Sequence, residues 1–467
     1  MNDTLNSRLK SLRGEDLLPM HMPGHKRNGR TAPEGMSYAN DITEIEGFDN
    51  LHSPTGVIRG IEKRACALWG ADDALISVNG SSALIEASIL SAVTKGDKIL
   101  IASNCHISVW HGIELTGATP VLIDPKTSED TPFLLGIAPA SIEEKLLSDS
   151  KIKAVVITSP TYEGIISDTK KIYEICRERG VLLIVDEAHG AHLGIKGDKG
   201  FPPSSRGDIV IKSVHKTMSA PTQTAVLLMF GDSADRRLLR HHVSVMQSTS
   251  PSYMLMAGLE KALMEPGTDE LYKNASALRE DLKSLRKLRL YTSPDHDISK
   301  IVILTGGLMT GYELASLLRE DFLIEVEAAF PSHIIAMTGT GDTASSLIRF
   351  AEAVKTIDST IEGEAGRKAH APVIPVISRK YKTDIRTALR APSSKVDLKD
   401  AAGQVSAEYV FSYPPGVPVL IPGQKITEDI IRVMEDLEDS GTSFKTDPFR
   451  AWDGTLLKVD IKGDIKV

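Results

Sequence analysis

The chain has 467 residues and a formal net charge of -8, with 41% hydrophobic and 25% charged residues. This is the composition of a globular protein, too long for one hydrophobic core, and its negative charge without a dense basic cluster argues against a nucleic-acid partner. Its sequence has no secretory signal, no apolar run of the roughly 20 residues that cross a membrane, and no metal-type clustering of its three cysteines, so we expect a cytoplasmic protein without a membrane partner, a disulfide framework or a metal.

Between residues 73 and 230, short apolar runs alternate with helical patterns. This alternation predicts an α/β domain with a mostly parallel sheet covered by helices on both faces. The strands are predicted at 75–78, 98–102, 120–123, 154–158, 182–186, 209–213 and 225–230. Helices are predicted at 82–93 and at 169–179, the second ending before Gly180.

After residue 251 the pattern becomes more helical, with predicted helices at 254–264 and 270–285. Beyond a boundary near residue 290, alternating elements predict a smaller α+β domain. Its strands are expected at 300–304, 324–327 and 333–337, and its helices at 312–318, 343–356 and 426–439. The predicted division is an N-terminal arm at 1–50, a large domain at 51–290 and a C-terminal small domain at 291–467.

In open α/β sheets, ligands bind where parallel strands end. The letters NGSS at 79–82 stand between a predicted strand and helix, where free helix amides and the hydroxyls of Ser81 and Ser82 make a cup for a phosphate. An ordinary helix N-cap fits the same letters. Asp186 ends an apolar strand, and a carboxylate there needs a partner such as a protonated pyridine nitrogen, although it also fits a residue that caps the next loop.

Two further residues follow predicted strands. Lys216 comes 30 positions after Asp186, and a partly buried lysine amine can form an imine with an aldehyde, although most lysines are solvated. His106 follows the strand at 98–102, where an imidazole can stack on an aromatic ring or serve as a loop residue. Together with the phosphate cup, these residues fall at one edge of one sheet in the order typical of a domain that binds pyridoxal 5'-phosphate.

At these residues the sequence resembles the Orn/Lys/Arg decarboxylase family, which has the fold of PLP-dependent transferases (aspartate aminotransferase, fold type I). The resemblance extends over nearly the whole chain. Besides the loop at Asn79, it is carried by MPGHK at 22–26, DITE at 41–44, DNLH at 49–52, SPTY at 159–162, DEAHGAH at 186–192, SVHK at 213–216, STSP at 248–251 and YPPGVP at 413–418.

The resemblance implies roles for individual residues. Lys216 would carry pyridoxal 5'-phosphate as a Schiff base, Asp186 would pair with its ring nitrogen, and His106 and Ala188 would lie against the two ring faces. The phosphate would be bound by Ser81, Ser82, Ser213 and His215, and by Ser248 of a neighbouring subunit. The active site would therefore lie at the interface of a homodimer or of a higher even-numbered homo-oligomer. The chain resembles the short form of the family, without an N-terminal receiver-like domain.

The implied reaction is decarboxylation of arginine, lysine or ornithine to the amine, feeding polyamine biosynthesis. The cofactor anchors alone leave open transamination, another fold type I reaction, or a catalytically silent regulator that binds the cofactor. Lys216 and His215 are both candidates for donating a proton to Cα. The sequence does not determine which of these amino acids is the substrate. The acids Asp41, Glu44 and Glu163 are candidates for binding its distal cation, and Gln424 and Asn50 stand where many relatives have an acid.

Overall fold

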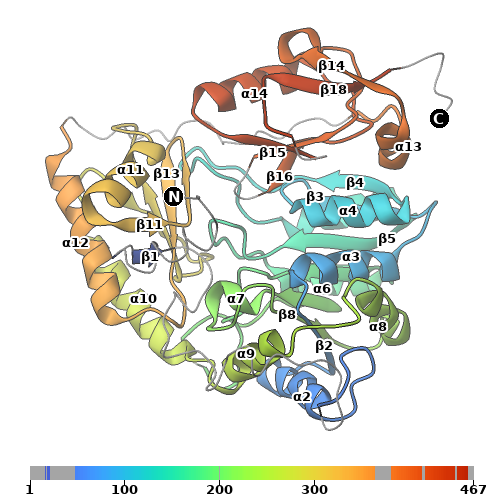
Figure 1. Cartoon of the computed structure of the whole chain (residues 1–467), viewed down its shortest axis with the longest axis horizontal. Coiled ribbons are helices and arrows are strands. Elements are labelled where there is room, and N and C mark those ends of the chain that lie inside the picture. The colour runs from blue at the N-terminus through green and yellow to red at the C-terminus, as the bar shows by residue number, and fades with distance from the viewer. Residues whose placement is uncertain are drawn as a thin grey trace, which may run out of the picture.

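The structure of the protein, a computed structural model, describes residues 16, 18–20, 48–198, 200–362, 380–412, 416–447 and 450–460. Figure 1 shows three parts: a large α/β part in blue to green, a second sheet with its helices in yellow and orange, and a C-terminal part in dark orange and red. None of the helices in these residues combines the length and the apolar character needed to span a bilayer.

Among the described residues, seven strands form the central sheet, in the order β2-β8-β7-β6-β5-β3-β4. Strand β8 runs antiparallel to both of its neighbours, and the other pairs are parallel, which confirms the predicted mostly parallel sheet. All seven predicted strands are present, each within two residues of its predicted ends. They are β2 (Asp73–Ser77), β3 (Lys98–Ala102), β4 (Thr119–Ile123), β5 (Ile152–Thr158), β6 (Leu182–Asp186), β7 (Ile209–Lys212) and β8 (Ala225–Met229).

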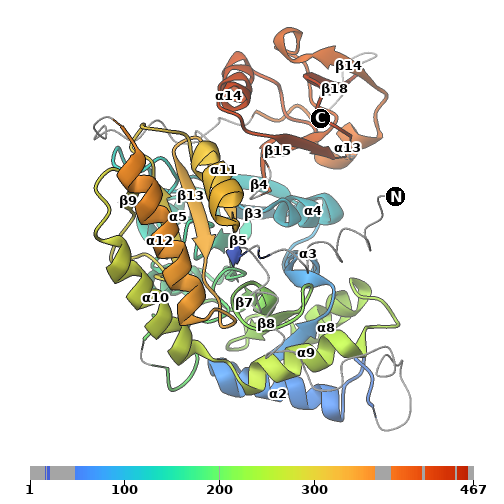
Figure 2. The same ribbon diagram turned by 60° about the vertical axis from the view of Figure 1, so that its left-hand side comes forward.

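The two faces of this sheet support separate hydrophobic cores, because successive side chains of a strand point to opposite faces. In β6, Leu183 and Val185 join one core and Ile184 joins the other. The first core is covered by α2 (Val57–Trp69), α5 (Pro139–Ser148), α6 (Thr169–Glu178) and α9 (Tyr253–Met264), and the second by α3 (Gly80–Ala92), α4 (Ile107–Thr116) and α8 (Arg236–Val245). Helices α2 and α9 lie side by side at the bottom of Figure 2. The sequence did not predict α4, because most of its residues are buried and it shows no amphipathic period.

A second sheet follows α10 (Thr268–Leu282). Its strands are antiparallel, in the order β12-β13-β10-β9, with a core that it shares with α10 and two further helices. The strands are β9 (Arg289–Leu290), β10 (Lys300–Leu304), β12 (Ala328–Phe330) and β13 (His333–Met337), and the helices are α11 (Gly311–Phe322) and α12 (Ala344–Thr360). The short β11 (Ile324–Val326) pairs instead with β1 (Leu18–Met20), in parallel.

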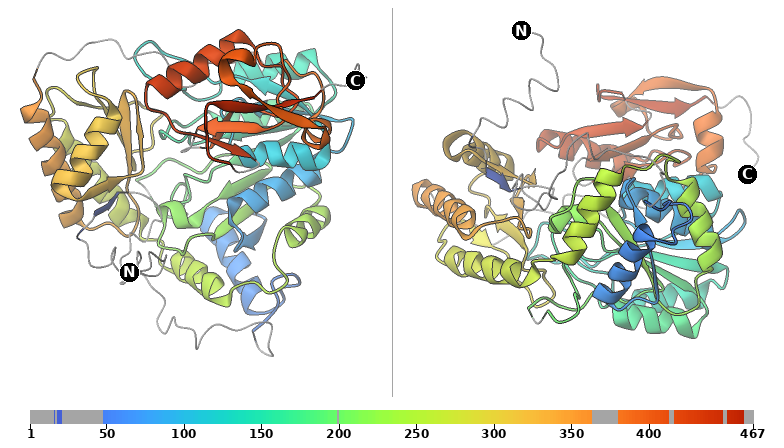
Figure 3. Two further views of the ribbon diagram at one scale, coloured as in Figure 1. Left: turned by 45° about the horizontal axis from the view of Figure 1, so that its top comes forward. Right: turned by 60° about the horizontal axis from the view of Figure 1, so that its bottom comes forward.

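The C-terminal part has its own hydrophobic core, which includes Ile430, Met434 and Phe444. It contains α13 (Ile385–Arg390), β14 (Ser393–Asp397), a 3-10 turn (Leu398–Asp400), β15 (Tyr409–Ser412), β16 (Val417–Leu420), α14 (Glu428–Asp439), β17 (Phe444–Asp447) and β18 (Thr455–Val459). Since the second sheet and the C-terminal part contribute to separate hydrophobic cores, we propose that the predicted C-terminal domain has two components. The C-terminal part packs against the large part (Figure 3). Its contact with α4 includes Tyr409, whose hydroxyl donates to Glu114 at 3.1 Å.

Candidate active site

The carboxyl ends of β2, β3, β6 and β7 lie at the same edge of the central sheet, because these four strands run in the same direction. Each is followed by one of the predicted site segments. The segment after β7 forms a single helical turn, α7 (Val214–Thr217), near the middle of the molecule between the large part and the second sheet (Figure 1). The fold therefore gathers these predicted site segments at one place.

The first turn of α3, after β2, has no side-chain cap, although the amide of Gly80 donates to the carbonyl of Gln223 at 2.8 Å. Asn79 occupies the N-cap position without making a side-chain cap, and its amide donates instead to the carbonyl of Met246 at 2.8 Å. The hydroxyl of Ser213 donates to that of Ser81 at 2.8 Å, which brings the loop after β7 against the start of α3. Free helix amides beside hydroxyls suit a phosphate group.

Asp186 ends β6 with its carboxylate withdrawn from water. It is 4% exposed, and the backbone amide of Ala188 donates to its Oδ1 at 3.0 Å. Burial raises the pKa of this carboxyl, against the lowering effect of nearby Lys216. A cationic group beside Asp186 would therefore be stabilised, as a protonated pyridine nitrogen would be.

Lys216 lies in the turn α7, and its Nζ is 2.9 Å from Nε2 of His189. Burial lowers the pKa of the amine below its usual value, and the charges of Asp186 and Glu327 oppose this effect. A lysine with a lowered pKa has more of the neutral amine that attacks a carbonyl carbon.

Two predicted histidines are held by one ring nitrogen each. His106 caps α4, with its Nδ1 accepting from the amide of Ser108 at 3.2 Å, and burial beside Lys216 lowers its pKa to about 3. It is therefore a neutral, flat ring at physiological pH. His215 has its Nδ1 at 2.9 Å from the carbonyl of Thr224, so that nitrogen carries the hydrogen.

Four side chains that received no role from the sequence complete the cluster. Nδ1 of His189 is 2.8 Å from Nζ of Lys300, and the ring of Tyr162 lies edge-on to His189 at 5.1 Å between centroids. The hydroxyl of Tyr162 donates to Glu327 at 2.8 Å. Tyr162 and His189 stand in motifs that carry the family resemblance. Lys300 begins β10 and Glu327 lies between β11 and β12, and neither has a local sequence signal.

The structure places other sequence candidates outside this cluster or away from its centre. Glu163 lies near Lys300 and hydrogen-bonds to Thr161, and burial raises its pKa. The Oε1 of Gln424 accepts from the amide of Ile421 at 3.2 Å, within the C-terminal part. The acids Asp41 and Glu44, the motif at 22–26 and residues 413–415 lie outside the described residues.

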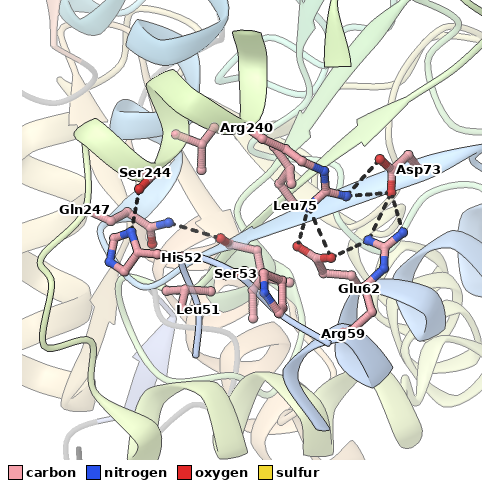
Figure 4. A pocket seen from close by; sticks show the side chains of 13 residues that line it. Leu51, His52, Ser53, Arg59, Glu62, Asp73, Leu75, Arg240, Ser244 and Gln247 are labelled. Atoms are coloured by element: carbon pink, nitrogen blue, oxygen red, sulfur yellow. Dashed lines mark hydrogen bonds and ion pairs between the residues drawn. The ribbon is translucent and has the colours of Figure 1, made fainter. Parts of the chain in front are cut away.

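Ser248 contacts His52, which lines a cavity of about 420 Å³ together with Ser244 and Gln247 (Figure 4). Its side chain is exposed, and its carbonyl oxygen is 2.8 Å from Nε2 of His52, whose Nδ1 is 2.6 Å from the hydroxyl of Ser244. Asp49, in the same family motif, accepts from the amides at the start of α2, including that of Ile58. The motif at 49–52 thus anchors the segment that carries Ser248.

Comparison with known proteins identifies the family. The model of the Orn/Lys/Arg decarboxylase major domain matches residues 17–299, and that of the C-terminal domain matches residues 367–445. The chain belongs to the Orn/Lys/Arg decarboxylase family. It is 30% identical to an arginine decarboxylase of Bacillus subtilis over 93% of both chains, and 22% identical to a lysine decarboxylase of Pseudomonas aeruginosa over 90% of this chain and 74% of that protein. The crystal structure of the Francisella novicida lysine decarboxylase is similar in fold, with a TM-score of 0.74 at 21% identity, over 89% of this chain and 73% of that one.

The site fits the cofactor of the Orn/Lys/Arg decarboxylases. The uncapped start of α3 suits its phosphate, the buried carboxylate of Asp186 suits its ring nitrogen, and the amine of Lys216 suits its aldehyde. The protein is accordingly a PLP-dependent amino-acid decarboxylase that acts on a basic amino acid. Its family membership favours decarboxylation over transamination, and an enzyme over a catalytically silent regulator.

Proposed function

We propose that this decarboxylase acts on L-arginine, with pyridoxal 5'-phosphate held by Lys216 and Asp186. The observation that carries the proposal is the juxtaposition of Lys216 and Asp186 at one sheet edge, beside the uncapped start of α3. Arginine is favoured among basic amino acids by the 30% identity to an arginine decarboxylase over 93% of both chains. The carboxylate of Glu327, near Lys216, suits the cationic group of such a substrate.

The residues around the cofactor have separate tasks. When bound, pyridoxal 5'-phosphate accepts the electron pair that the broken Cα–carboxylate bond leaves behind. Asp186 would hold a proton at the ring nitrogen, and His106 and Ala188 would lie against the two faces of the ring. Ser81, Ser82, Ser213 and His215 would bind the phosphate. Together these residues would orient the ring and the substrate bond to be broken.

Lys216 is also the residue that we assign as proton donor to Cα. His215 is the other candidate, but its Nδ1–H is engaged by the carbonyl of Thr224. The amine of Lys216, by contrast, contacts His189, which itself contacts Lys300. After Lys216 gives a proton to Cα, this hydrogen-bonded neighbour can replace it. The products are carbon dioxide and the amine that remains when the substrate loses its carboxylate. This amine is of the kind that polyamine synthesis uses.

A substrate panel tests this function. Purified protein supplied with pyridoxal 5'-phosphate is incubated separately with L-arginine, L-lysine and L-ornithine, and carbon dioxide, amine and keto acid are quantified. Arginine is expected to give equal amounts of carbon dioxide and amine, with kcat/KM at least about tenfold above the other two substrates, the discrimination available from 1–3 kcal/mol of pocket contacts. Keto acid as the main product would contradict decarboxylation, and a preference for lysine or ornithine would contradict the choice of arginine.

We further propose a cytoplasmic homodimer in which Ser248 reaches the phosphate of the neighbouring subunit. Support comes from the exposed position of Ser248 and from the anchoring of its segment by His52, and the free cysteines are compatible with a reducing compartment. Mixed dimers of Lys216→Ala and Ser248→Ala chains provide the test. One site of each mixed dimer then has both residues intact, so mixing the two variants should restore activity. No gain over the separate variants would contradict a shared site.

A further inference from the structure

Two lysines contact opposite nitrogens of the same imidazole ring. Nζ of Lys216 is 2.9 Å from Nε2 of His189, and Nζ of Lys300 is 2.8 Å from Nδ1. Lys216 follows a strand of the central sheet, whereas Lys300 begins β10 of the second sheet and is fully buried. The ring therefore connects the two parts of the molecule directly at the candidate active site.

A neutral imidazole has one hydrogen-bearing nitrogen and one acceptor nitrogen. Burial holds the pKa of His189 well below its usual value, and the two lysines act in the same direction, so its ring is neutral. One lysine must then donate to the ring while the other accepts from it. Since an ammonium group has no lone pair to accept a hydrogen bond, the lysine on the N–H side is a neutral amine.

The surroundings of Lys300 favour the positive charge on that side of the ring. Its Nζ lies 5.6 Å from the centre of the Tyr162 ring, in a cation–π contact. Asp297, a neighbour of Lys300, is anionic. Burial raises the pKa of its carboxyl, but His192 and other partners, Lys300 among them, lower that pKa to about 2. Gly164 encloses the stem of the lysine closely, because a Cβ at that position would lie 2.7 Å from Cγ of Lys300.

We propose that Lys300 is a positioning residue, whose ammonium donates to Nδ1 of His189 and so directs the Nε2–H of that ring to a neutral amine at Lys216. The inference rests on the proposed role of Lys216 as the amine that carries the cofactor. That amine attacks the aldehyde carbon, a C=N bond forms and one water leaves, so the nitrogen must have a free electron pair at the start. Lys300 takes part in no covalent step.

Other titratable groups surround these three side chains. Lys216 faces Asp186, His106 and Glu327; His189 faces His106 and His215 as well as the two lysines; and Lys300 lies near Glu163, His296 and Asp297. Burial lowers the pKa of His106 to about 3 and that of His296 to about 4, so neither ring changes its charge near neutral pH. A pH profile near neutrality therefore does not report on these two rings.

The test follows formation of the C=N bond rather than turnover. Full-length protein is freed of its cofactor, pyridoxal 5'-phosphate is added back, and the absorbance of the imine is recorded over time across a range of pH. In Lys300→Met, the pH at which the rate is half-maximal is expected to be about one unit higher than in the wild type, because a like charge and a fixed donor are lost. The rate at neutral pH should fall about tenfold. Lys98→Met is the matched control: Lys98 is also the first residue of its strand, but it pairs with Asp149, so its profile should stay unchanged.

A double-variant cycle separates action through the ring from simple repulsion. His189→Asn is expected to shift the profile upward as well, since the Nε2–H donor to Lys216 is lost. If Lys300 acts through His189, adding Lys300→Met to His189→Asn moves the midpoint by less than half of its effect in the wild type. Fully additive shifts would overturn the positioning role.

Peptide mapping after borohydride reduction distinguishes failure of this inference from failure of the proposed function. A wild-type protein without label at Lys216 contradicts the role of Lys216 itself, whereas label at Lys216 with superimposable wild-type and Lys300→Met profiles contradicts only the role of Lys300. Should the variants not fold, as judged by circular dichroism, 15N NMR of the wild type decides. The expected result is a hydrogen on Nε2 of His189 and none on Nδ1, and the reverse overturns the inference.

Discussion

Two lysines four positions apart, Lys212 and Lys216, lie in contrasting surroundings. Lys212 ends β7 and is fully buried, forms an ion pair with Glu187, and donates to the carbonyls of Gly190 at 2.9 Å and Leu193 at 3.2 Å. Lys216 instead faces the imidazole of His189. Burial lowers the pKa of both amines. Burial alone therefore does not identify a reactive lysine; its hydrogen-bond partners do, because carbonyls and a carboxylate hold an ammonium in place.

The consecutive acids Asp186 and Glu187 are divided in the same way. Asp186 acts on Lys216, whereas Glu187 pairs with Lys212 and accepts from Ser204 and Ser205. Successive side chains at the end of a strand point in opposite directions, so one acid reaches the ligand edge and the other the interior. Substitutions on the two sides of this division should therefore have different effects.

Replacing Lys216 with Ala should have the largest effect, because it removes the amine that the proposed function requires. We expect no imine absorbance and a loss of kcat of at least about 10³-fold, the scale seen when a covalent catalytic group is removed. Spectra with added pyridoxal 5'-phosphate and carbon dioxide release from arginine measure both. Retained turnover with bound cofactor would contradict the assignment of Lys216.

Lys212→Met should reduce stability instead of chemistry. The substitution leaves the carboxylate of Glu187 buried without its cation, which is expected to lower the free energy of unfolding by about 3–5 kcal/mol. Urea denaturation measures the loss, and Lys98→Met, at a partly exposed ion pair, should cost about 1 kcal/mol or less. If Lys212→Met abolished imine formation at unchanged stability, Lys212 and not Lys216 would be the reactive lysine.

Asp186→Asn should reduce kcat/KM for arginine by about 10²-fold, since a neutral amide does not stabilise a proton on the ring nitrogen. Stability should not fall, because burial raises the pKa of Asp186 and its ionised form is costly in the fold. Steady-state kinetics and thermal unfolding of the two proteins give both values. Asp186→Glu retains the charge and should recover part of the activity, whereas wild-type kinetics in Asp186→Asn would remove Asp186 from the site.

The smallest effect is expected at Tyr162, on the side of the site formed by the second sheet. Tyr162→Phe removes the hydrogen bond to Glu327, worth about 0.5–1.5 kcal/mol, and should lower kcat/KM by about threefold to tenfold. Tyr173→Phe is a matched control, because the hydroxyl of Tyr173 bonds to Arg177 within α6. Equal kinetics in both variants would mean that the Tyr162–Glu327 contact does not act on the reaction.

Local pattern was sufficient for most of the central sheet. The ends of β3 and β6 agree with prediction, because a buried parallel strand is a continuous apolar run bounded by polar residues. The pattern was insufficient where burial is uniform, as in α4, or where the chain changes direction. The predicted strand 324–327 corresponds to β11, and the sequence did not predict β12, which follows directly after the change of direction. A helix buried on most sides has no polar face to reveal its period.

The sequence by itself determined the α/β fold and the group of Asp186, Lys216, His106 and the NGSS loop, since each follows its own strand and parallel strands end at one edge. Only the tertiary structure decided which side chains surround the amine of Lys216. Lys300 lies 111 positions from His189, and Glu327 lies 165 positions from Tyr162. Contacts over such separations depend on how the second sheet packs against the first, and no periodic pattern within a single segment encodes that packing.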